Sequence, residues 1–148
     1  MRDINKLSSN VMARQVFLTL ATVDAPPPAT LEKAREALSR WLARRKLALP
    51  GLVVENGAGL SRNERLSAGG LARLLAAADA SEVREEFASS LAVAALDGTV
   101  QRRFQNGTVA GQALPKTGSP EGVRALAGYV IDREGRRWIV AAIVNHPN

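Results

Sequence analysis

The order of apolar and polar positions predicts helices over most of the chain and strands near its end. Residues 7–21 are apolar around most of the helical circumference, which predicts a buried helix with Ser8, Ser9 or Asn10 as its N-cap. A break at residues 24–28, which contains three prolines, ends this first segment. The polar residues that open the helix are therefore either caps or members of a site.

Three further helices and one short strand are predicted before residue 105. A helix capped by Thr30 carries one apolar stripe at helical spacing, and Ser67 and Ser81 start the next two helices. Val83 and Phe87 are expected to face inward on the last of these, and residues 52–54 read as a short buried strand. Residues 99–104 read as one or two helical turns.

The last 40 residues predict three strands, at residues 109–117, 123–131 and 137–144. The last two are joined by a four-residue hairpin loop that ends in Gly135. Both faces of residues 123–131 are largely apolar, so we expect helices on both faces of an antiparallel sheet. The fold class is α/β (α+β), and residues 1–148 are expected to form a single domain.

Composition limits the chemistry that the chain can perform. It has no cysteine and a single histidine, His146, so thiolate, Ser-His-Asp and histidine-metal sites are not expected. We expect no cofactor and no metal site. No apolar run is long enough to cross a membrane, and the first residues do not resemble a signal peptide.

A formal net charge of +6 suggests a nucleic-acid partner at first sight. The basic residues, however, are spread along the chain, and aromatic residues that could stack on bases make up only 4%. We therefore expect no nucleic acid as a partner, and keep a basic nucleic-acid-binding protein as an alternative.

The triplet Lys116-Thr117-Gly118 is the first candidate for chemistry. The lysine ammonium and the threonine hydroxyl can both bind a carboxylate, and glycine lets another backbone approach closely. Three residues are a weak motif on their own, because a lysine where a loop enters a strand is common.

Two motifs in the right order give the chain a family resemblance. Ser8-x-Asn10 at the head of a helix and Lys116-Thr117-Gly118 before a hairpin resemble the second and third motifs of the penicillin-binding proteins. The chain is most similar to the type called penicillin-binding protein 4, the D-alanyl-D-alanine carboxypeptidases/endopeptidases of peptidase family S13. The supporting stretches are residues 3–6, 55–62, 97–103 and 126–130.

The resemblance implies a partial serine β-lactamase/transpeptidase-like fold and a role for each matching residue. Ser8 would relay protons, Asn10 would donate to the substrate carbonyl, and Lys116 would hold Ser8 and the terminal carboxylate. Thr117 would bind the same carboxylate, and Gly118 would let the substrate lie along the strand. Arg62 would contact a charged group of the stem peptide.

The family's nucleophile motif, Ser-x-x-Lys, does not occur in the chain, because no serine has a lysine three residues later. The resemblance therefore implies the C-terminal portion of such an enzyme, inactive alone. Its implied partners are peptidoglycan stem peptides ending in D-Ala-D-Ala and β-lactams, and its parent family is periplasmic. A non-catalytic peptidoglycan- or partner-binding module is the alternative. The apolar strand 137–144 would offer an unpaired edge for self-association.

Overall fold

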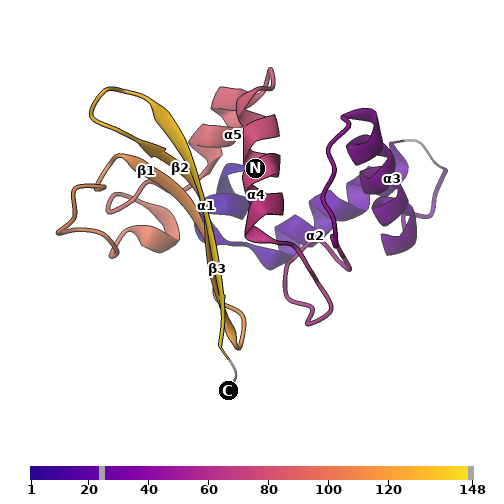
Figure 1. Ribbon diagram of the computed structural model, residues 1–148. Helices are drawn as coiled ribbons and strands as arrows, with labels where there is room; N and C mark the ends of the chain where they lie inside the picture. Colours follow the sequence, from indigo (N-terminus) through magenta and orange to yellow (C-terminus); the bar gives the residue numbers. More distant parts are fainter. Residues whose placement is uncertain (24–25, 147–148) are drawn as a thin grey trace. The chain divides into compact units, whose positions relative to one another are not determined.

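A computed structural model describes residues 1–23 and 26–146 as two compact units (Figure 1). The first unit contains residues 1–8 and 71–148, and the second contains residues 9–70. The assignment of residues 1–148 to a single domain stays a prediction. Two of the residues in the expected break, 24 and 25, lie outside the described part of the chain.

The first unit is built on a three-stranded antiparallel sheet in the order β1-β2-β3. Its strands are β1 (Ala113–Gly118), β2 (Val123–Ile131) and β3 (Arg137–Asn145). The β2–β3 hairpin is confirmed, with Ile131 paired to Arg137 across the loop. The predicted fold class, helices with an antiparallel sheet, is confirmed.

One face of the sheet packs against α4 (Ala68–Asp79) and α5 (Arg84–Ser90). Tyr129 is the centre of this core, and because Leu114 and Ile139 are its partners on the two neighbouring strands, all three share one face. The ring of Phe87 meets the Tyr129 ring edge-on, with centroids 6.3 Å apart. The buried residues of this cluster are Leu75, Ala88, Leu91 and Tyr129.

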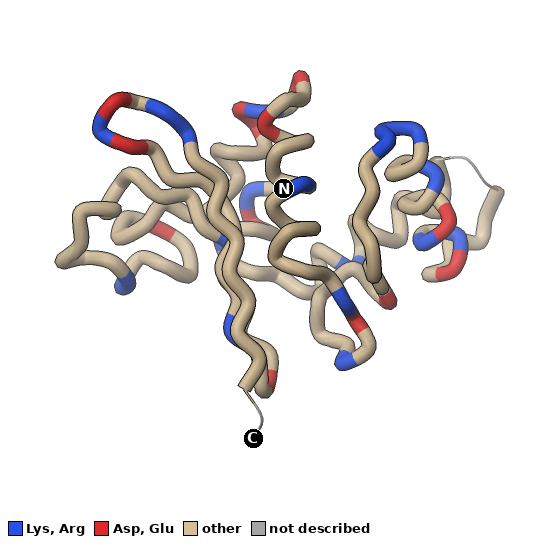
Figure 2. The backbone as a smooth tube through the Cα atoms, in the orientation of Figure 1, with Lys and Arg blue, Asp and Glu red and all other residues tan. Residues whose placement is uncertain are grey.

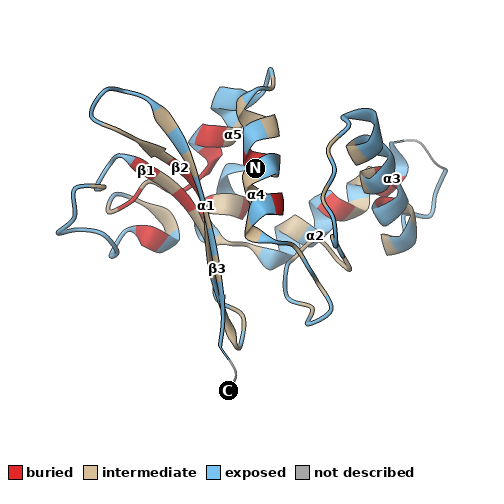
Figure 3. Ribbon diagram, viewed as in Figure 1, coloured by how far each residue is buried: buried red, intermediate tan, exposed pale blue. Residues whose placement is uncertain are grey.

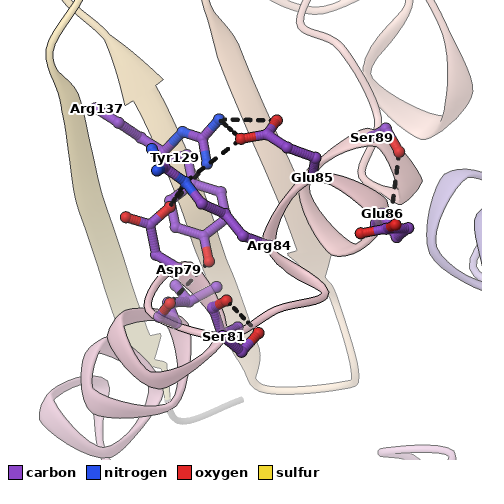
Figure 4. A network of polar contacts seen from close by, with 10 residues as sticks. Asp79, Ser81, Arg84, Glu85, Glu86, Ser89, Tyr129 and Arg137 are labelled. Carbon is purple, nitrogen blue, oxygen red and sulfur yellow. Dashed lines mark hydrogen bonds and ion pairs between the residues drawn. The ribbon is translucent and has the colours of Figure 1, made fainter.

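Polar contacts fix the same helices to the sheet (Figure 4). The Tyr129 hydroxyl donates a 2.8 Å hydrogen bond to the Leu75 carbonyl, which removes the cost of burying an unpaired hydroxyl. The Arg137 guanidinium donates to Asp79 at 2.7 Å and to Glu85 at 3.3 Å, and lies 5.4 Å from the Tyr129 ring centre. These contacts raise the pKa of Arg137, chiefly through the hydrogen bond to Asp79.

The opposite face of the sheet is covered only in part. Turns from the segment 98–112 supply Phe104 and Val109, which line an apolar pocket of about 120 Å³ with Pro115 and Val140. Every second residue of β3 is exposed on this face, including Trp138 and Val144, at 55% and 60% (Figure 3). The sheet therefore has one packed face and one partly open face.

The second unit contains α2 (Asn10–Thr19), the 3-10 turn η1 (Leu20–Thr22) and α3 (Leu31–Arg44). Thr30 caps α3 as predicted, accepting from the Lys33 amide at 3.2 Å. The small core of the second unit is formed by Phe17, Ala21 and Ala34. Among the described residues, no helix is both long and apolar enough to span a membrane.

Five local expectations were wrong. Ser81 does not start α5, whose N-cap is Val83, because the Ser81 hydroxyl donates back to the Ala78 carbonyl. The helix predicted at 7–21 is broken at Ser8 and Ser9, and α2 buries only Phe17, because the neighbouring helix contacts a single stripe of its surface. Residues 52–54 form no strand, since Val53 makes only one isolated bridge, to Arg65. Val83 is 60% exposed because α5 starts one residue after it. The predicted first strand, 109–117, begins only at Ala113 because the preceding residues form hydrogen-bonded turns.

Charged residues of both signs are spread over separate elements (Figure 2). The β2–β3 loop carries Asp132 and Glu134 beside two arginines, and α3 likewise mixes acidic and basic residues. The Asp132 carboxylate accepts from Trp138 Nε1 and Arg136 Nε, both at 2.8 Å, and these bonds lower its pKa to about 2. The exclusion of nucleic acid stays a prediction.

Candidate active site

Ser8 ends the helix α1 (Arg2–Leu7) in a left-handed conformation, with φ 55° and ψ 46°. This conformation costs a residue with a side chain on the order of 1 kcal/mol, and it is typical of helix ends and of functional sites. The backbone N–H of Ser8 closes the helix by donating to the Ile4 carbonyl. Ser9 then caps α2, so the chain turns between two helices and Ser8 is the C-cap of the first rather than the N-cap of the second.

Two side chains that precede Ser8 anchor α1 within the first unit. Lys6 is buried, with 11% of its side chain exposed, and is ion-paired to Asp97. Asn5 donates to the Ser90 hydroxyl at 2.8 Å, and Ser90 donates to the Phe87 carbonyl. These contacts fix the end of the helix that carries Ser8.

Burial on its own would raise the pKa of Asp97. The hydrogen bonds that its carboxylate accepts from Lys6 and from the Val93 amide outweigh that effect and leave the pKa below its usual value. Asp97 is therefore an anion at neutral pH and an effective partner for the buried lysine.

Lys116 is the fourth residue of β1, and its ammonium reaches Ser8. The Nζ atom donates to Ser8 Oγ at 2.8 Å and to the carbonyl of Thr117 at 2.7 Å. Burial lowers the pKa of Lys116, because a less hydrated site disfavours the charged form. An amine of lowered pKa beside a hydroxyl can exchange protons with it more readily.

Thr117 and Gly118 complete β1 beside the lysine. The Thr117 hydroxyl lies 3.4 Å from the Thr99 hydroxyl, which comes from the 3-10 turn η2 (Gly98–Val100). A Cβ atom at Gly118 would meet Ala125 at 3.6 Å, an ordinary contact, so packing within the chain does not require glycine there. β1 is an outer strand of the sheet.

Asn10 and Arg62 belong to the second unit. Asn10 is the first residue of α2, and Arg62 is exposed in the loop 55–64. The Glu55 carboxylate organises that loop by accepting from the Ser61 hydroxyl and, at 2.8 Å, from the Asn63 amide. These bonds lower the pKa of Glu55, with Ser61 the largest contributor. Gly57 must be glycine, since a Cβ there would lie 2.4 Å from Phe17.

The structure thus brings together Ser8, Lys116 and Thr117 of the six predicted site residues, with Gly118 next in the strand. The pattern of residues did not assign a role to Lys6, Asp97 or Thr99. Asp97 and Thr99 lie in one of the stretches that carried the resemblance, which is the signal that could have pointed to them. In the described part of the chain no three His, Asp or Glu side chains are grouped to hold a metal, and the absence of a metal stays a prediction.

Comparison with protein families identifies the family of the chain that carries this site. The model of the D-Ala-D-Ala carboxypeptidase 3 (S13) family matches residues 1–148, and the chain belongs to that family. It is 31% identical over 153 residues to carboxypeptidase DacB of Mycolicibacterium smegmatis, covering 99% of this chain. It is 35% identical over 101 residues to the D-alanyl-D-alanine carboxypeptidase of Actinomadura sp. strain R39, covering 65% of this chain.

Solved structures show the same fold. Penicillin binding protein 4 (dacB) from Haemophilus influenzae superimposes with a TM-score of 0.90 over 99% of this chain, at 23% identity. The Bd0816 predatory endopeptidase from Bdellovibrio bacteriovorus matches with a TM-score of 0.75 at 19% identity. The expected partial transpeptidase-like fold is confirmed.

The chain spans only part of these proteins. It covers 33% of the Mycolicibacterium relative, 18% of the Actinomadura relative and 33% of the Haemophilus structure. The activity of a whole enzyme is therefore a proposal for this sequence.

Proposed function

We propose that this chain supplies two walls of the acyl-transfer cleft of a serine D-Ala-D-Ala carboxypeptidase or endopeptidase that acts on peptidoglycan stem peptides. The observation that carries the proposal is the 2.8 Å contact between Lys116 Nζ and Ser8 Oγ, in a chain of the S13 family. These residues are 108 positions apart, and each comes from one of the two motifs that define the family resemblance.

The chemistry assigned to the two side chains is proton transfer and anion binding. Ser8 Oγ accepts from the Lys116 ammonium, so its own proton is available to a leaving amine or to another basic group. The positive charge of Lys116 stabilises a nearby carboxylate or an alkoxide that forms during the reaction. The lowered pKa of Lys116 favours its exchange of a proton with Ser8.

The remaining residues are proposed to bind the substrate. Thr117 donates to the terminal carboxylate, and Asn10 donates its amide to the peptide carbonyl. The substrate lies along the outer edge of β1 as an added strand, next to Gly118. The ordinary contact that a Cβ would make at Gly118 supports this, since the glycine then serves a molecule outside the chain. Arg62 is proposed to contact a charged group of the stem peptide.

The nucleophile does not come from this sequence, because the chain contains no Ser-x-x-Lys. We propose that residues 1–148 are the C-terminal portion of a transpeptidase-like domain, that they form no acyl-enzyme alone, and that the complete enzyme reacts with β-lactams in the periplasm. A structure of the Haemophilus relative contains a β-lactam, which supports this reading.

The test uses the purified chain with fluorescent penicillin and with N-acetyl-D-Ala-D-Ala. We expect no covalent label, and we expect binding of the peptide that is lost in Lys116→Met. A covalent label on the isolated chain would overturn the assignment of the nucleophile to another sequence. Binding that survives Lys116→Met would overturn the assignment of the carboxylate to Lys116. Thr22→Val, at an exposed hydroxyl that bonds within its own helical turn, is the control.

A non-catalytic binding module is the second candidate, and the missing Ser-x-x-Lys is the observation that favours it. It uses the same anion site at Lys116. The two candidates differ when the chain is supplied with a polypeptide that carries Ser-x-x-Lys. Fluorescent penicillin then labels the assembly if the chain is part of an enzyme, and does not label it if the chain is a non-catalytic binding module.

A further inference from the structure

The turn that carries Thr99 is held firmly against α1. The Asp97 carboxylate just before it pairs with buried Lys6 and accepts from the Val93 amide at 2.7 Å. A Cβ atom at Gly98 would lie 2.7 Å from the Lys6 carbonyl oxygen, so only glycine allows the turn to approach the helix this closely. Val100 is fully buried on the other side of Thr99. The backbone at Thr99 is thus fixed by its neighbours.

The side chain of Thr99, in contrast, is exposed and lies beside the sheet. Its hydroxyl is 3.4 Å from the Thr117 hydroxyl. Two hydroxyls have two protons, but they share only one hydrogen bond, so one O–H remains available. Within the described residues neither hydroxyl has another hydrogen-bond partner.

The residue before Thr117 in β1, Lys116, determines which kind of ligand suits this pair of hydroxyls. Lys116 places a positive charge one residue from Thr117, and its ammonium donates to the Thr117 carbonyl at 2.7 Å. Two exposed hydroxyls with a spare proton beside an ammonium group favour an anionic acceptor. A carboxylate has two oxygens, so it can accept from the spare O–H, and from both hydroxyls at once when it replaces the hydrogen bond between them.

We propose that Thr99 is a further ligand of the carboxylate that Lys116 and Thr117 bind, and that Asp97 and Gly98 are positioning residues that hold it there. The proposal rests on the proposed function, and it adds a group from outside the two family motifs. The ligand class is the C-terminal carboxylate of a peptide. The carboxylate is then bound between two elements, η2 and β1, and not by β1 alone.

The test compares N-acetyl-D-Ala-D-Ala with its C-terminal amide, whose neutral end cannot accept in the same way. Affinities are measured by NMR titration of the chain and of Thr99→Val, Thr117→Val and the control Thr22→Val. We expect Thr99→Val and Thr117→Val each to weaken binding of the acid by about tenfold, the lower end for a hydrogen bond to a charged group. The preference for the acid over the amide is expected to shrink in both variants and to persist in the control.

The outcomes separate this inference from the proposed function. If Thr117→Val weakens acid binding and Thr99→Val does not, the role of Thr99 is overturned and the proposed function remains. If the unmodified chain does not prefer the acid to the amide, both are overturned. Thr99 is exposed and valine has the same shape as threonine, so the melting temperature of Thr99→Val is expected to match that of the unmodified chain. A loss of affinity that is confined to the acid therefore shows that Thr99 contacts the carboxylate and is not needed only for the fold.

Discussion

The two outer strands of the sheet differ in how they are fixed. β1 is tied to distant parts of the chain: Ala94 donates to the Ala113 carbonyl at 2.9 Å, and Lys116 reaches Ser8. β3 pairs with β2 through their hairpin, and its first residue, Arg137, bonds to Asp79 and Glu85, but its second face leaves Trp138 and Val144 exposed. The strand that reaches Ser8 carries the candidate site. The strand with the open face presents apolar surface.

The largest expected effect is the loss of β1 from the sheet in Gly128→Val. A Cβ at Gly128 would lie 2.1 Å from the Leu114 carbonyl oxygen, and neither backbone can move without breaking the pairing. We expect a loss of about 3 kcal/mol in the free energy of unfolding, measured with denaturant. Gly118→Ala, with its ordinary 3.6 Å contact, serves as the control. Equal stability of both variants would show that the close approach of the strands is not needed.

Asp97→Asn is expected to cost about 2 kcal/mol of unfolding free energy, because Lys6 is then left as a buried cation without its anionic partner. The matched control is Glu134→Gln, which removes an exposed partner of Arg136 and is expected to cost less than about 0.5 kcal/mol. The measurement is again denaturant unfolding. Similar values for the two variants would mean that the Lys6–Asp97 pair does not anchor α1.

A smaller effect on stability, but a visible effect on assembly, is expected at β3. We propose that the open edge and face of β3 cause self-association, as expected for an unpaired apolar strand. Val144→Lys places a charge on that face and is expected to reduce association in sedimentation experiments, while it changes stability by less than about 0.5 kcal/mol. A monomeric unmodified chain, with β3 protected from hydrogen exchange, would contradict the proposal.

The smallest effect concerns the loop that joins β2 to β3. The pKa of Asp132 is lowered to about 2, chiefly by the Trp138 and Arg136 side chains. A carboxyl whose pKa is lower in the folded state stabilises the fold above its ordinary pKa, and this contribution is lost as the pH falls toward 2. Carboxyl NMR titration measures the value directly, and Trp138→Phe is expected to raise it. A midpoint near 3.8 would show that these bonds do not form.

The difference between β1 and β3 also explains how much of the sheet could be predicted from the sequence. β2 and β3 follow from alternating apolar residues and a Gly-containing loop, which are local signals. The start of β1 could not be predicted in this way. Val109 accepts from the amides of Gln112 and Ala113, and Gly111 donates to the Ala94 carbonyl, so tertiary contacts decide where the strand begins.

The residues of the candidate site likewise divide into those that short motifs predicted and those that only tertiary contacts bring together. Lys116, Thr117 and Ser8 were found through two short motifs and the family that they resemble. No local pattern indicated that Lys6 is buried against Asp97, or that Thr99 lies beside Thr117, since those pairs are 91 and 18 residues apart. The helical period likewise predicted a buried α2, but periodicity does not show which faces find a partner.

The pH dependence of carboxylate binding tests the central claim, that the Lys116 ammonium is the anion-binding group. Burial lowers the pKa of Lys116 below its usual 10.5, so the ammonium loses its charge at a lower pH than an ordinary lysine does. We expect the affinity for N-acetyl-D-Ala-D-Ala to be level near neutral pH and to fall with a midpoint below 10.5. In Lys116→Arg, whose side chain stays charged, the fall is expected to disappear. An affinity that stays level through pH 10.5, or that falls equally in Lys116→Arg, would contradict the account.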